Sequence, residues 1–179
     1  MNLTNIKPGK TVKIGNEKFT VLKHLENGVL CIRDNILDER RAFDVKECNN
    51  WSKSSLREYL NGEWLQEFVK NIDSTGIDGE LIYDFESDLT TDDGMKDYGT
   101  STDKVFLLSC DQYREFRHLF RKLDASWWLI TGDSLIYSHI ARSVYTDGTL
   151  YGSGAYHGNY GVRPACVFNP SILIKEEGM

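Results

Sequence analysis

The sequence predicts a mixed α+β fold of small antiparallel sheets flanked by two or three helices. Three observations support this prediction: apolar residues alternate near the N-terminus, recur at helical spacing in the middle, and form strand-like runs separated by turns near the C-terminus. A chain of 179 residues has the size of one domain. We therefore expect a single domain over 1–179, with an N-terminal β-meander at 1–48 and a core at 49–179.

The N-terminal meander is predicted from period-two alternation and turn residues. Val12 and Ile14 alternate with polar residues, a Gly-Asn pair at 15–16 predicts a turn, and Phe19 and Val21 continue the alternation. Asn27-Gly28 is typical of a hairpin turn and precedes an apolar strand at 29–32.

Two short helices are expected after residue 50. Leu56, Tyr59 and Leu60 have helical spacing, and Asn61-Gly62 predicts the end of the first helix. A second short helix is expected over 64–69. Trp51 and Trp64 are large apolar groups beside these helices, so we expect them in the core rather than as ligand platforms.

The segment 71–103 is predicted to be largely loop, with one short strand at 81–83. Its acidic part, 84–97, lacks the alternate spacing and terminal Glu of an EF-hand, so a solvated loop is the default and calcium binding is left open. Order returns with a buried strand at 104–109. Ser109 and Gln112 then form a capping box that starts a helix ending near Leu123. The basic run at 114–122 is expected to be its solvated face.

The last third alternates strands and turns. Strands are expected at 126–130, 135–145 and 161–168, with a hairpin turn at Asp147-Gly148 and a glycine-rich loop at 152–160. Trp127 and Trp128 must point to opposite faces of their strand, so one ring is expected in the core and the other toward a loop or solvent. Arg163, in an apolar strand, needs acceptors and is expected to bind backbone carbonyls or a carboxylate such as Asp133 or Asp147.

The loop composition predicts a binding surface between two anchoring strands. Tyrosine provides contact area at low entropic cost, and Gly, Ser and Asn provide adaptable hydrogen bonding. Trp127 and Arg163 are predicted to be structural. The predicted ligand-binding residues are Trp128, Tyr137, His139, Tyr145, Asp147, Tyr151, Tyr156, His157, Asn159 and Tyr160.

Charge and composition argue against several classes of protein. A net charge of −6 is unlike a nucleic-acid binder, and no apolar run is long enough to span a membrane. The start of the chain has no secretory h-region. The four cysteines are far apart, and Cys31 and Cys166, in apolar strand-like runs, are expected to be buried free thiols, consistent with a reducing cytoplasm. No P-loop, dinucleotide or nucleophile-elbow motif occurs. We expect no catalytic residues, no metal and no cofactor, and neither a nucleic acid nor a membrane as partner.

Several short motifs resemble an uncharacterised family of small bacterial and phage domains of unknown function. They are Asn50-Trp51, Ser55-Leu56-Arg57, Leu60-Asn61, Lys104 to Ser109, Trp127-Trp128-Leu129 and Gly161-Val162-Arg163-Pro164-Ala165. The family usually has Arg where this chain has Ile130. The last two motifs are also similar to C-type-lectin-like folds, including formylglycine-generating enzymes and phage receptor-binding domains. This similarity implies a lectin-like core at 49–179 with a ligand surface on its late loops, but no cysteine in a late loop matches the enzymes' catalytic pair.

These observations favour a non-catalytic binding module for a protein or glycan partner, in the cytoplasm or on a phage particle. Two alternatives stay open: an enzyme whose site lies in the late loops, and a phage structural or host-interaction protein. The ligand's identity, the biological process and the oligomeric state are left undetermined by the sequence.

Overall fold

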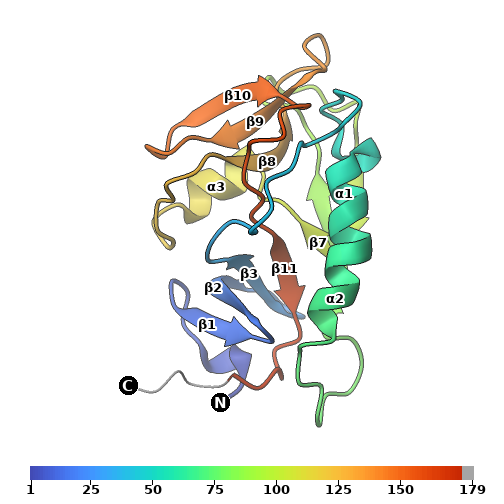
Figure 1. Ribbon diagram of the computed structural model, residues 1–179. Helices are drawn as coiled ribbons and strands as arrows, with labels where there is room; N and C mark the ends of the chain where they lie inside the picture. Colours follow the sequence, from blue (N-terminus) through green and yellow to red (C-terminus); the bar gives the residue numbers. More distant parts are fainter. Residues whose placement is uncertain (175–179) are drawn as a thin grey trace.

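The computed structural model describes residues 1–174 and shows a mixed α+β fold (Figure 1). Its largest sheet has the order β1-β2-β3-β11-β4, and β7 also pairs with β11. All of these pairings are antiparallel. The strands are β1 (Thr11–Ile14), β2 (Glu17–His24), β3 (Val29–Arg33), β4 (Ile82–Tyr83), β7 (Val105–Phe106) and β11 (Ala165–Phe168).

The N-terminal meander forms as predicted and pairs with the last strand. Gly15 turns the chain at φ +62°, in the left-handed region that favours glycine. A Cβ at Gly28 would lie 2.6 Å from Val167, so the β2–β3 turn requires glycine where it passes β11. Because Ile32 lies opposite Ala165 and Val29 opposite Phe168, residues from the two ends of the chain share one sheet.

The second sheet has the order β10-β9-β8 and lies at the opposite end of the molecule from the N-terminus (Figure 1). Its strands are β8 (Trp127–Gly132), β9 (Ile140–Val144) and β10 (Leu150–Gly154). The strands predicted at 135–145 and 161–168 are shorter than expected. The segment before β9 turns so that its carbonyls face Asn49, and Gly161 makes only a single bridge, to Trp127.

One helical column runs along the side of the large sheet (Figure 1). It consists of η2 (Trp51–Lys53), α1 (Ser55–Tyr59), η3 (Leu60–Trp64) and α2 (Leu65–Val69). The prediction that Asn61-Gly62 ends a helix is wrong, because the chain continues through a π-helical turn, η3. Asn61 is instead tied to the sheet: its side chain donates to the Val105 carbonyl and accepts from the Val105 amide.

The helix α3 (Cys110–Phe116) begins with the predicted capping box between Ser109 and Gln112. It ends at Phe116 rather than near Leu123. The chain leaves the helix so that Phe120 can pack against Trp127, with ring centroids 6.1 Å apart. Tertiary packing of one aromatic ring therefore overrides the helical periodicity.

The segment expected to be loop contains a two-stranded hairpin, β5 (Phe85–Asp88) and β6 (Thr100–Asp103). Asp103 from this hairpin is buried and accepts hydrogen bonds from Trp51 Nε1, Arg57 Nε and Ser101 Oγ. Trp51 and Trp64 are both buried, as predicted. A 3₁₀ turn, η1 (Leu3–Asn5), completes the described elements. No helix in 1–174 has the length and apolar character that a membrane span needs.

Candidate functional site

The predicted contact residues divide into two groups at the two ends of the β9–β10 hairpin. Ile140 pairs with Gly154 and Val144 with Leu150, so the flanking segments separate. Tyr137 and His139 precede β9 and lie beside Tyr156 and His157, because the Ala155 amide donates to the His139 carbonyl at 2.7 Å.

The second group lies at the other end of the hairpin. Tyr145 and Tyr151 are both exposed, with ring centroids 6.0 Å apart. Asp147 accepts hydrogen bonds from the amide and hydroxyl of Thr149, and these bonds lower the pKa of its carboxyl. Asp147 therefore holds its own turn.

Trp128 has to be removed from the predicted contact surface. Its side chain is 0% exposed, so a ligand cannot touch it. The ring stacks on Tyr160 at 4.3 Å, and Nε1 donates to the Arg41 carbonyl. Tyr160 is itself half-buried, and its hydroxyl is hydrogen bonded to Ser153. The Trp128–Tyr160 stack therefore supports the late loop from below.

Trp127 and Arg163, the two residues predicted to be structural, are both buried. Trp127 is buried, with edge contacts to Tyr113 and Phe120. Arg163 is fully buried and donates to the backbone carbonyls of residues 33 and 34, both at 2.8 Å. The carboxylates suggested as alternative partners have other contacts: Asp133 lies 3.5 Å from Arg142, and Asp147 binds Thr149.

The first group continues into a wider exposed apolar surface that the sequence prediction did not include. Ile136 is 86% exposed and Tyr137 57%. Val45, 71% exposed, reaches the same end because the Asp44 amide donates to the Ala155 carbonyl. We call this the apical surface; it consists of Val45, Ile136, Tyr137, His139, Tyr156 and His157.

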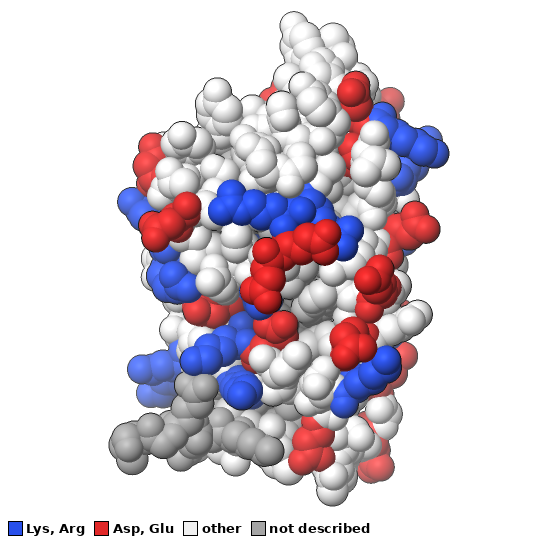
Figure 2. Space-filling model, in the orientation of Figure 1, with Lys and Arg blue, Asp and Glu red and all other residues white. Residues whose placement is uncertain are grey.

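The late segments that form most of the apical surface carry no charged side chain, whereas Val45 is followed by the exposed Lys46 and Glu47. Segments 134–141 and 148–162 contain no Asp, Glu, Lys or Arg, although 27% of the chain is charged. The projecting upper end of the molecule in Figure 2 is accordingly white, with charged groups lower on the same face. Asn159 completes the nearby loop; its side chain is exposed and its carbonyl accepts from Arg40.

The buried Asn49 holds the backbone of residues 134–140, which we call the apical loop. The amide nitrogen of Asn49 lies 3.0, 3.3 and 2.9 Å from the carbonyls of Ser134, Tyr137 and Ile140. Its own backbone amide donates to the Ser138 carbonyl at 2.7 Å.

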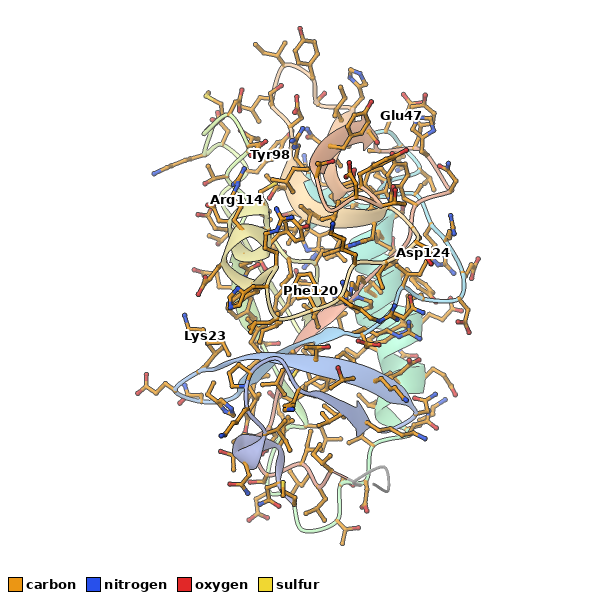
Figure 3. All side chains as sticks on the ribbon, turned by 90° about the vertical axis from the view of Figure 1, so that its left-hand side faces the viewer. Lys23, Glu47, Tyr98, Arg114, Phe120 and Asp124 are labelled. Atoms are coloured by element: carbon orange, nitrogen blue, oxygen red, sulfur yellow. The ribbon has the colours of Figure 1, made fainter. Side chains whose placement is uncertain are left out.

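The remaining acceptor of Asn49 is also occupied. Tyr98 donates its hydroxyl to Asn49 Oδ1 at 2.7 Å, and burial raises the pKa of that hydroxyl, helped by Cys48 and Asp97. Figure 3 shows Tyr98 at the upper end of the molecule. Sequence reasoning missed Asn49, because its carbonyl partners lie 85 to 91 residues away and Tyr98 lies 49 residues away.

Acidic side chains of the loop at 84–97 bind other residues of the protein. Asp92 pairs with Arg114 and Arg142, and Asp88 accepts from Thr90. Within residues 1–174, no group of three or more His, Cys, Asp or Glu side chains could hold a metal ion.

Comparison with protein families shows which family the chain matches. A family described as Domain of unknown function (DUF6273) matches residues 26–170, which confirms the predicted likeness to an uncharacterised domain family. No curated protein and no solved structure matches the chain.

Proposed function

The chain belongs to the DUF6273 family, and we propose that this domain is a non-catalytic binding module whose apical surface contacts a protein partner. The observation that supports the proposal most directly is the exposure of Ile136, Tyr137 and Tyr156 on uncharged segments. Exposed apolar patches are typical of interaction sites, and the centre of a protein interface is rich in aromatic residues and poor in charge.

The apical surface is held in place by buried residues, which favours a role in binding over apolar side chains that are exposed without a function. Side chains on an unanchored loop lose entropy on binding, whereas a preorganised loop loses less. Asn49 and Tyr98 hold the backbone of 134–140 through buried hydrogen bonds, and the Trp128–Tyr160 stack supports 155–160. The aliphatic side chains of Val45 and Ile136 favour a protein over a glycan, since sugar sites combine aromatic faces with polar groups.

The proposal includes the C-type-lectin-like assignment. Short antiparallel sheets and flanking helical segments support it. A location in the cytoplasm or on a phage particle stays a prediction.

The proposal is tested by identifying a partner with the wild-type domain as bait and then measuring the affinity of the purified pair. Tyr156→Ala and Ile136→Ser are expected to weaken binding at least about tenfold, about 1.4 kcal/mol each, as for interface residues that contribute strongly. Leu173→Ser is the matched control, because Leu173 is 48% exposed near the N-terminal residues, to which it is joined by a bridge with Asn2.

Equal affinity of the apical variants and the wild type would rule out this surface. A glycan array run with the same variants distinguishes the ligand class: a glycan whose binding is lost in Tyr156→Ala would replace the protein partner.

A further inference from the structure

A second candidate site lies beside the β9–β10 turn, outside the apical surface. The helix α3 contributes Tyr113, the segment that follows it contributes Arg117, Arg121 and Lys122, and the turn contributes Tyr145. These residues line a pocket of about 50 Å3. Pockets for whole small molecules are about 300–1,000 Å3, so this pocket has room for one functional group.

Two cationic side chains converge on the turn. A Cβ at Gly148 would lie 3.3 Å from both Arg117 Nη2 and Lys122 Cε, and Gly148 has φ +86°. The turn is held against the helix because the Tyr113 hydroxyl donates to the Gly148 carbonyl at 2.7 Å. The Arg117 guanidinium lies 5.2 Å from the Tyr113 ring centroid. The hydrogen bond from Tyr113 therefore fixes the turn beside the Arg117 and Lys122 side chains.

The pocket has an excess of positive charge. Its described lining contains no Asp or Glu, and over residues 1–174 neither Arg117 nor Lys122 forms an ion pair within 4.0 Å. Asp147, next to Gly148, is the nearby acidic group; it interacts electrostatically with Lys122, and its carboxyl is held by Thr149. Arg121 reaches Asp34 at 3.4 Å. By contrast, Arg114 on the same helix pairs with both Asp111 and Asp92. In a chain of net charge −6, such a group of cations is not a consequence of composition.

A buried cation lies behind the pocket. The Arg163 guanidinium is 4.7 Å from the ring centroid of Phe120 and 5.1 Å from that of Trp127, and both rings line the pocket. Its Nη1 has no hydrogen-bond partner among the described residues. The pKa of Arg163 is lowered to about 10, mainly because the side chain is buried. Attraction to Asp34 opposes this lowering, and repulsion from Arg121 adds to it. Arg163 therefore remains charged at neutral pH and adds to the positive potential.

We propose that this pocket binds an anionic group of the size of a carboxylate or a phosphate, held by Arg117 and Lys122 and covered by Tyr145. Arg117 and Lys122 would donate charge-assisted hydrogen bonds to the anion. The negative charge of the bound anion would also offset the repulsion between Arg121 and Arg163. Two members of the basic run that the sequence predicts as a solvated helix face, Arg117 and Lys122, thus have a specific role. The pocket shares no residue with the apical surface, so either proposal can fail without the other.

The test is a titration of the ¹⁵N-labelled domain with inorganic phosphate and, separately, with acetate, at constant ionic strength. Saturable shifts are expected at the amides of Gly148 and residues 117–122. Arg117→Met and Lys122→Met are each expected to weaken the apparent affinity at least about tenfold, and Lys122→Arg to restore part of it. Arg114→Met is the control on the same helix and should bind like the wild type. Circular dichroism and thermal unfolding of each variant establish that it is folded.

The two titrations separate the possible anions. Saturation by acetate alone identifies a carboxylate, and saturation by phosphate alone identifies a phosphate. Shifts that do not saturate, or that fall as much in Arg114→Met as in Lys122→Met, would show diffuse attraction to a basic surface and overturn the proposal.

Discussion

Replacing Asn49 should both destabilise the domain and release the apical loop. Its two N–H groups serve three backbone carbonyls and its oxygen accepts from Tyr98, so three buried hydrogen-bonding groups are lost in Asn49→Ala. At about 1 kcal/mol for each, the free energy of unfolding should fall by about 3 kcal/mol. Asn159→Ala, at an exposed asparagine, is the matched control.

Asn49→Asp provides a sharper test because it keeps the shape of the side chain but replaces the hydrogen-bond donor with an acceptor. A carboxylate has no proton to donate and would face three carbonyl oxygens, so at neutral pH this variant should be less stable than Asn49→Ala. Burial among carbonyls should raise the pKa of the new carboxyl above its ordinary value of about 3.9. Below pH about 3.9 the carboxyl is protonated in both the folded and the unfolded state, so the destabilisation caused by its charge should be absent there. This destabilisation should appear as the pH rises through the raised pKa of the folded state.

The assay combines urea denaturation, followed by tryptophan fluorescence, with hydrogen exchange of the amides of 134–140. Both variants should lower the urea midpoint and speed exchange in that segment. If Asn49→Ala stayed within about 0.5 kcal/mol of the wild type with unchanged exchange, Asn49 would not be the anchor.

Other substitutions test the same packing. Gly132→Ala should cost about 1–3 kcal/mol, because its Cβ would lie 2.9 Å from Asn49 Cγ, whereas Gly158→Ala has nothing within 4 Å and should be nearly neutral in chemical denaturation. Arg163→Met should lower the free energy of unfolding by about 2–4 kcal/mol, since it removes the donor to the partly buried carbonyls of residues 33 and 34; a melting temperature equal to that of the wild type would contradict this. In the native state only Cys48 should react readily with a thiol reagent, because burial raises the pKa of the other three thiols; labelling of a second cysteine at the same rate would contradict this.

Local features of the fold could be predicted because the residues that determine them are neighbours. The turns at Asn27-Gly28 and Asp147-Gly148 and the capping box at Ser109 each depend on a few adjacent positions. The β5–β6 hairpin was missed, because its alternation is carried by Ser, Thr and Asp rather than by apolar residues.

The candidate site was predicted as a region but not as an arrangement. The sequence identifies a late loop rich in Tyr, Gly and His, yet burial removes Trp128 from its surface. It also cannot indicate that Val45, about a hundred positions earlier, joins the same surface.

By itself, then, the sequence determined the mixed α+β class, the N-terminal meander, the burial of the tryptophans beside the first helices, and membership of an uncharacterised family. Only the tertiary structure decided that α3 stops at Phe116, that Asn49 anchors the apical loop, and that the cations of the basic run face the β9–β10 turn. The physical reason is the same in each case. These outcomes depend on tertiary contacts, such as the packing of Phe120 on Trp127 after α3 and the bonds of Asn49 to carbonyls 85 to 91 residues away, and such contacts leave no periodicity or spacing in the sequence.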